Sequence, residues 1–200
     1  PEMFPLTDNV LLKTVSMIHD PVTTTDELIP SGETSSYRSN PLGLAEFTLS
    51  RKDPAYVGKA KEVQKAEKAL EAGECPAEAV PELKTVMDAI RAHFSEQAAS
   101  CQRVLGGMAN IAREYAKKRY RSNLINWGML PFIFDGDLPF DKDDFILVKD
   151  VKDAFANKKD SVKAYVVNKG MKEMEFKLGR LTDDEREIIL KGCLINYNKK

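Results

Sequence analysis

The stretch from Met108 to Phe134, MANIAREYAKKRYRSNLINWGMLPFIF, decides the fold. It opens with a short apolar run, MANIA, and closes with a second one, MLPFIF, and both are typical of buried strands. Between them, REYAKKRYRSNLINW has the composition of a helix that ends at Gly128. A strand, a helix and a second strand in direct succession predict a protein of the α/β class.

The part of the chain that precedes this stretch continues the alternation. VLLKTVSMI, from Val10 to Ile18, is rich in β-branched residues and predicts a strand. A charged helix is expected from about Pro54 to Ala72, on the surface because its apolar residues are few. SEQAASCQRVLGG predicts a helical stretch that Gly106 and Gly107 end. Apolar residues at helical spacing predict a further, amphipathic helix: Leu83, Val86, Met87, Ile90 and Phe94.

The part that follows contains strands, a hairpin and a last helix. DFILVKDV predicts a strand, and SVKAYVVNKGMKEMEFKL predicts a hairpin that turns at Asn168, Lys169 and Gly170. TDDEREIILKG predicts a helix, because Thr182 and Glu185 have the spacing of a capping box. The length of 200 residues suits a single domain, so we expect residues 1–200 to form one.

The composition limits the function classes. The chain is 42% hydrophobic and 30% charged with a net charge of -1, so nucleic acid is not expected as a partner. We find no apolar run of the ~20 residues that span a bilayer and no signal-peptide core. We therefore expect a cytoplasmic protein that does not associate with a membrane. Cys75, Cys101 and Cys193 have neither disulfide nor metal-ligand spacing. The chain begins at Pro1 rather than methionine, which suggests a processed product or part of a longer protein.

A polar stretch from Thr23 to Pro41, TTTDELIPSGETSSYRSNP, is the first candidate site. It can be an ordinary loop, because Thr24 and Glu27 have capping-box spacing for a helix that starts near Leu28. It can also be a loop that holds an anionic small molecule through its hydroxyls and Arg38. The residues alone leave both alternatives open.

Other candidates are weaker. His19 and His93 have no acid and nucleophile nearby in the sequence that would make a triad. Trp127 beside Gly128 is interpreted as core packing. A basic cluster next to two tyrosines is either a solvated helix face or a patch for an anion or a partner: Lys117, Lys118, Arg119 and Arg121.

Four segments, in order along the chain, resemble the C-terminal swivelling domain of the aconitase and isopropylmalate isomerase family. TTDELIPSGETSSYR is similar to the family's TTDHISAAGPWLKYR, and EQAASCQRVLGG is similar to EHAALEPRHLGG. YRSNLINWGMLPF resembles the YRNAINVGL and TNLKKQGLLPLTF stretches. DDEREIILKGCLINY resembles the family's ending, an acidic helix followed by Gly-Gly-x-Leu-Asn-Tyr. Residues 43–92 have no counterpart and look like a helical insertion of a subgroup of hydratases.

This resemblance implies a β/β/α domain with a mixed sheet and flanking helices, belonging to a longer hydro-lyase. Such a lyase dehydrates and hydrates a hydroxy di- or tricarboxylic acid with a 4Fe-4S iron-sulfur cluster. We expect the cluster to be held by the other domains or a large subunit and not by this chain. The alternative is a non-catalytic regulatory or RNA-binding relative, which the altered serine motif described below and the basic cluster support.

The resemblance also implies roles for individual residues. Arg38 becomes the clamp for a substrate carboxylate, with Thr24 and Thr25 as hydroxyl donors. Asp26 corresponds to an acidic catalytic residue of the family.

The family's serine motif, Gly-x-Gly-Ser-Ser-Arg-Glu-His, is altered to AHFSEQ in this chain. Glu96 falls on the motif's glutamate, as a substrate-binding residue, and Ser95 on the place of its arginine. Either the base has been lost, or residues between Phe94 and Ser95 are missing from the sequence. We favour the omission, which makes Ser95 part of the catalytic motif and places it close to Arg38.

Overall fold

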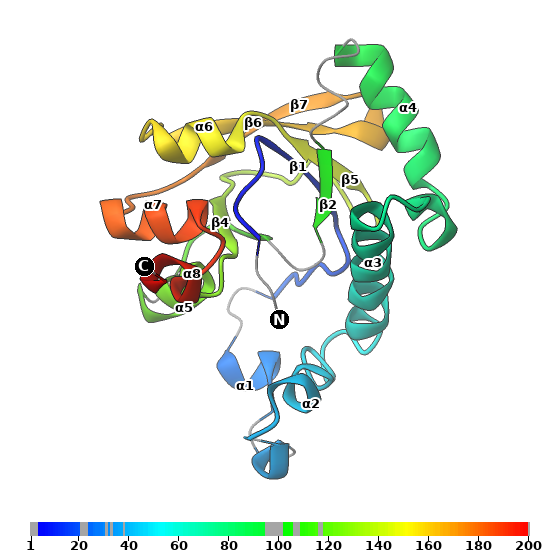
Figure 1. Ribbon diagram of the computed structural model, residues 1–200. Helices are drawn as coiled ribbons and strands as arrows, with labels where there is room; N and C mark the ends of the chain where they lie inside the picture. The colour runs from blue at the N-terminus through cyan, green and yellow to red at the C-terminus, as the bar shows by residue number, and fades with distance from the viewer. Residues whose placement is uncertain are drawn as a thin grey trace.

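The computed structural model describes residues 4–20, 24–30, 32, 34–37, 39–94, 102–105, 109–115 and 118–199. They form a mixed seven-stranded sheet with flanking helices, which confirms the α/β class (Figure 1). The strands are β1 (Asn9–Lys13), β2 (Gln102–Leu105), β3 (Ala109–Ala112), β4 (Leu130–Ile133), β5 (Phe145–Val148), β6 (Ser161–Val166) and β7 (Lys172–Lys177). The longer helices are α3 (Tyr56–Glu71), α4 (Leu83–Phe94), α5 (Lys118–Asn126), α6 (Val151–Ala156) and α7 (Asp183–Leu190). Shorter helical turns are α1 (Thr25–Leu28), η1 (Ser35–Tyr37), α2 (Pro41–Ala45), η2 (Pro76–Glu78), η4 (Val167–Lys169) and α8 (Leu194–Asn198).

The sheet has the strand order β2-β1-β5-β6-β7-β4-β3, with parallel pairs at its two ends and antiparallel pairs between them. The outermost strands, β2 and β3, are consecutive in the chain. From Leu105 to Ala109 the chain can span at most ~15 Å, whereas seven strands in a flat sheet would place its edges roughly 29 Å apart. The sheet therefore curls, so that its two edges approach each other.

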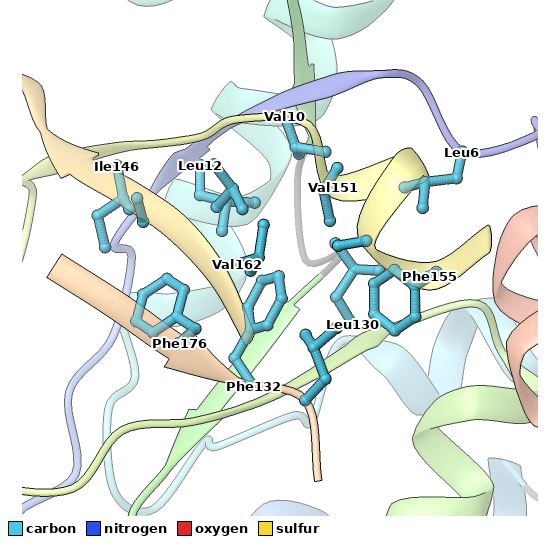
Figure 2. Packing of buried hydrophobic residues seen from close by; sticks show 14 of the residues in the cluster. Leu6, Val10, Leu12, Leu130, Phe132, Ile146, Val151, Phe155, Val162 and Phe176 are labelled. Atoms are coloured by element: carbon cyan, nitrogen blue, oxygen red, sulfur yellow. The ribbon is translucent and has the colours of Figure 1, made fainter. Parts of the chain in front are cut away.

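Two groups of buried side chains pack on β1 and β5. The first core cluster contains Val10, Ile146 and Phe132, whose ring stacks on Phe176 at 4.9 Å between centroids (Figure 2). The second contains Leu11 together with residues of α3 and α4. Successive side chains of a strand point to opposite faces, so both faces of β1 and β5 are buried. Helices α3 and α4, which lie within the stretch 43–92 expected as an insertion, thus cover one face of β1 and β5.

Several expected elements are confirmed. Helix α4 covers the apolar pattern that begins at Leu83. Strands β6 and β7 form the hairpin, and Gly170 takes the left-handed conformation at its turn, with φ 66°. Thr182 and Glu185 form the capping box at the start of α7.

Other expectations are wrong in part. Gln102–Leu105 is a strand rather than the end of a helix, because it pairs in parallel with β1. DFILVKDV does not stay extended, since α6 begins at Val151. The first strand ends at Lys13, short of Ile18. Helix α3 is not simply a surface helix, because Val63 and Ala66 are fully buried in the second core cluster.

Three chain segments meet at a pair of glycines. Gly128 has φ 77°, and a Cβ atom added there would lie 1.7 Å from the carbonyl oxygen of Gly192. Gly192 has φ 90°, and a Cβ atom there would lie 2.2 Å from the carbonyl oxygen of Phe4. We call this contact the glycine junction. The adjoining Trp127 is 62% exposed, so its interpretation as core packing is wrong. At this point the backbones of Gly128 and Gly192 pack against each other, and the indole stays on the surface.

Candidate functional site

The polar stretch predicted as a site follows β1 and carries α1 and η1. Thr24 lies directly before α1, Thr25 is its first residue and Asp26 its second. Arg38, Ser95 and Glu96 lie outside the described residues. The expected approach of Arg38 to Ser95 and the proposed omission after Phe94 therefore stay predictions.

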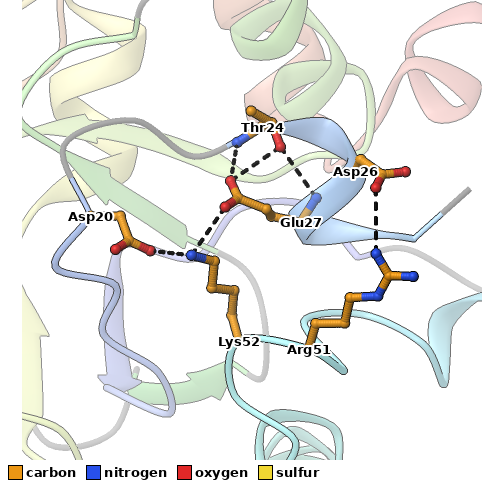
Figure 3. Close-up of polar contacts among 6 residues, drawn as sticks. All are labelled: Asp20, Thr24, Asp26, Glu27, Arg51 and Lys52. Carbon is orange, nitrogen blue, oxygen red and sulfur yellow. Dashed lines mark hydrogen bonds and ion pairs between the residues drawn. The ribbon is translucent and has the colours of Figure 1, made fainter.

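A capping box holds the start of α1. The backbone N–H of Thr24 donates to a Glu27 carboxylate oxygen at 2.7 Å, and the Glu27 N–H donates to Thr24 Oγ1 at 3.4 Å (Figure 3). Thr24 Oγ1 also donates to the same carboxylate at 3.1 Å. The capping interpretation of this pair is thus confirmed, but the helix that it caps begins at Thr25 and ends at Leu28 instead of starting there. The Thr24 hydroxyl assigned to substrate serves as this helix cap.

Lys52 ties this capped turn to the segment that precedes it. Its Nζ lies 2.5 Å from Asp20 and 3.0 Å from Glu27 (Figure 3). The bond from the Thr24 N–H and the contact with Lys52 hold the pKa of Glu27 below its usual value. The hydrogen bonds with Asp20 and Glu27 raise the pKa of Lys52. Glu27 and Lys52 therefore stay charged at neutral pH.

Replacing Lys52 by glutamine should raise the pKa of Glu27, because the substitution removes a cation that favours its charged form. Carboxyl chemical shifts followed through a pH titration measure this change. Lys61→Gln is the matched control, since Lys61 pairs with Glu46 at 2.6 Å elsewhere on the surface. An unchanged Glu27 titration in Lys52→Gln would show that the capping bonds alone set its pKa.

Asp26 faces a different cation. Its carboxylate lies 3.7 Å from an Nη of Arg51, and both side chains are about half exposed, at 55% and 53% (Figure 3). This contact places a guanidinium beside the carboxylate that the sequence assigned to the site. Sequence reasoning missed Arg51 and Lys52.

Two contacts bring Arg51 and Lys52 to α1. The N–H of Leu49 donates to the carbonyl of Leu28 at 2.7 Å, and Leu49 has a left-handed φ of 56°. Asp53 pairs with Lys142 at 2.7 Å, which lowers the pKa of Asp53. These partners are distant in sequence, so no local pattern signals the arrangement.

The basic cluster of α5 divides into two kinds of residue. Arg121 donates to the carbonyl of Arg180 and lies 3.8 Å from Glu185, so it holds α5 against α7. Lys118 and Arg119 are exposed. Lys117 lies outside the described residues. Only the exposed part of the cluster is suited to contact a partner.

The described cysteines do not fit a cluster site. Cys75 is exposed at the start of η2, whereas Cys193 is buried before α8. Over the described ranges, no three His, Cys, Asp or Glu side chains gather in a way that could hold a metal ion. Within the same residues, no helix is both long enough and apolar enough to cross a membrane.

Comparisons with known proteins give no relative. No protein-family model, no curated protein and no solved structure matches this chain.

Proposed function

We propose that the chain is the C-terminal swivelling domain of an aconitase-like hydro-lyase that acts on a hydroxy di- or tricarboxylic acid. The observation that carries the proposal is the glycine junction. It joins two of the segments that resemble the family, YRSNLINWGMLPF through Gly128 and DDEREIILKGCLINY through Gly192. Segments that are distant in sequence and resemble one family are therefore in direct contact in this fold.

The chemistry assigned to this chain is to bind and orient the substrate. A guanidinium binds a carboxylate through two parallel, charge-assisted hydrogen bonds and keeps it ionised. Arg38 supplies that group near the end of the polar stretch, and Ser95 is assigned to the catalytic serine motif. Since the described residues do not fit an iron-sulfur cluster, the proposal assigns the cluster to the companion part of the enzyme.

The exposed Lys118 and Arg119 support a second candidate, a non-catalytic regulatory or RNA-binding relative. The full-length gene distinguishes the two. A Gly-x-Gly-Ser motif before Glu96 and three cluster cysteines upstream support the enzyme, and their absence supports the relative.

In the complete enzyme, Arg38→Lys should lower kcat/KM roughly 30-fold, which corresponds to a loss of about 2 kcal/mol of transition-state stabilisation. Lysine keeps the positive charge but cannot form the bidentate hydrogen bonds of a guanidinium. Turnover of a panel of hydroxy acids measures this effect, beside a melting curve that should not change. Arg113→Lys is the control, since the Arg113 side chain is 74% exposed and lies outside the residues assigned to the substrate.

Two outcomes would contradict the proposal. One is unchanged kinetics in Arg38→Lys, and the other is a loss of rate that a loss of stability explains.

A second experiment treats residues 1–200 alone with iron and sulfide. The product should stay colourless and inactive, and a stable brown protein would contradict the assignment of the cluster to the companion part.

A further inference from the structure

Helix α7 contains a buried arginine whose side chain lacks an acceptor. Arg186 is only 7% exposed, and its Nη1 atom is buried without a hydrogen-bond partner in the part of the chain that the structure describes. The other buried polar residues of that part are hydrogen-bonded: Asn9, Thr34 and Asp144. Buried charges in folded proteins are paired or bind an ion. Arg186 therefore differs from the rest of the buried polar residues and calls for an explanation.

The acid that shares a face of α7 with Arg186 is already paired. Asp183 lies one helical turn before Arg186, so the two side chains are neighbours on the helix surface. The Asp183 carboxylate lies 2.7 Å from Nζ of Lys158, which follows α6, and α6 lies next to α7 (Figure 1). The bond with Lys158 lowers the pKa of Asp183, with a smaller contribution from Arg186. Since Lys158 and Asp183 neutralise each other, the guanidinium of Arg186 keeps a net positive charge at this contact.

The remaining acids of α7 are in other contacts or in solvent. Glu185 lies 3.8 Å from Arg121 of α5, Asp184 accepts a hydrogen bond from α8 at 3.0 Å, and Glu187 is exposed. None of these contacts involves the Arg186 guanidinium. Water and salt screen exposed carboxylates, whereas a buried guanidinium is screened much less. The buried Nη1 atom of Arg186 therefore attracts a negative group although α7 is an acidic helix.

We propose that Arg186 binds a small oxyanion, the carboxylate or the phosphate group of a ligand. A guanidinium presents a planar fork of N–H donors that matches both groups through charge-assisted hydrogen bonds. A water molecule could accept a hydrogen bond from Nη1, but it would not neutralise the buried charge. The side chain is not completely enclosed, so a small group can approach it from solvent. The inference does not rest on the proposed function, which assigns the substrate to the polar stretch and not to α7.

Thermal unfolding of the chain tests this site, because a ligand that binds only the folded protein raises Tm. Inorganic phosphate and succinate are each compared with chloride at equal ionic strength. We expect Tm to rise by about 5–10 °C at an anion concentration about 100 times Kd. A rise with phosphate alone assigns the site to a phosphate group, and a rise with succinate alone assigns it to a carboxylate.

Arg186→Met removes the charge and keeps a long, unbranched side chain. Without an added oxyanion, the Tm of this variant should equal or exceed that of the unchanged protein, because a buried charge has been removed. The rise with phosphate or succinate should disappear. Arg113→Met is the matched control, since the Arg113 side chain is 74% exposed, and its response to the anions should match that of the unchanged protein.

Nuclear magnetic resonance locates the bound anion. The arginine Nε–Hε signal that is missing from the spectrum of Arg186→Met belongs to Arg186. In the unchanged protein this signal should shift as phosphate or succinate is added, and the shift should saturate at the Kd that the thermal data give.

Three outcomes would overturn the inference. A Tm of Arg186→Met far below that of the unchanged protein in chloride would show that the guanidinium already has a partner in the folded chain. Equal rises in Tm for the unchanged protein and Arg186→Met would show only the general stabilising effect of such salts. The absence of a rise with either anion would show that water satisfies the guanidinium.

Discussion

Gly128→Ala should destabilise the protein by about 3–5 kcal/mol, which is a large part of a typical folding free energy. An L-residue in the left-handed conformation costs about 1–2 kcal/mol. The added methyl group would also lie 1.7 Å from the carbonyl oxygen of Gly192, so the backbones of α5 and of the α7 to α8 turn must separate. Thermal unfolding should show a fall in Tm on the order of 10 °C.

Gly73→Ala separates the two causes. Gly73 has φ 76°, nearly the same as Gly128, but an added Cβ atom there would contact nothing within 4 Å. This control should therefore show only the conformational cost of about 1–2 kcal/mol. Equal effects of the two substitutions would mean that the glycine junction is not closely packed, and the main support of the proposed function would be lost.

Phe132→Ala should cost about 3–5 kcal/mol, the usual range for a phenylalanine removed from a core. Its ring is fully buried in β4 and stacks on Phe176, which comes from the adjacent strand β7. The substitution leaves a cavity between the parallel end of the sheet and its antiparallel centre. Chemical denaturation monitored by circular dichroism measures the change in the free energy of unfolding.

Phe134→Ala is the matched comparison. Phe134 contacts the same Phe176 ring edge-on at 6.1 Å, but it is only partly buried. It should cost clearly less than Phe132→Ala, because less apolar surface returns to water. If the two variants were equally stable, the first core cluster would not be packed as described.

Local patterns predicted the elements whose contacts are themselves local. The apolar spacing from Leu83 defines α4, and the capping box of Thr182 and Glu185 defines the start of α7. The turn at Gly170 lies between strands that pair with each other. Each of these signals is contained within a few residues of the structure that it specifies.

Long-range contacts decided the features that the sequence did not reveal. Gln102–Leu105 forms a strand because its backbone pairs in parallel with β1, although the local pattern favours a helix. Trp127 is exposed because two glycine backbones fill the contact beside it. At the candidate site, the Thr24 and Glu27 cap was predictable from spacing, but Lys52 reaches it only through the path of the folded chain.

The pairing of β1 with β5 has a consequence for synthesis on the ribosome. Val10 is aligned with Val148, so the first strand has its antiparallel neighbour only after most of the chain has been translated. At ~5–20 residues per second this delay is on the order of ten seconds. During that time β2 is the one strand neighbour of β1 that can pair with its apolar VLL segment, and the side of β1 that pairs with β5 stays open. The hairpin of β6 and β7 follows β5 after the short helix α6, so the centre of the sheet can assemble as a unit and then pair with β1.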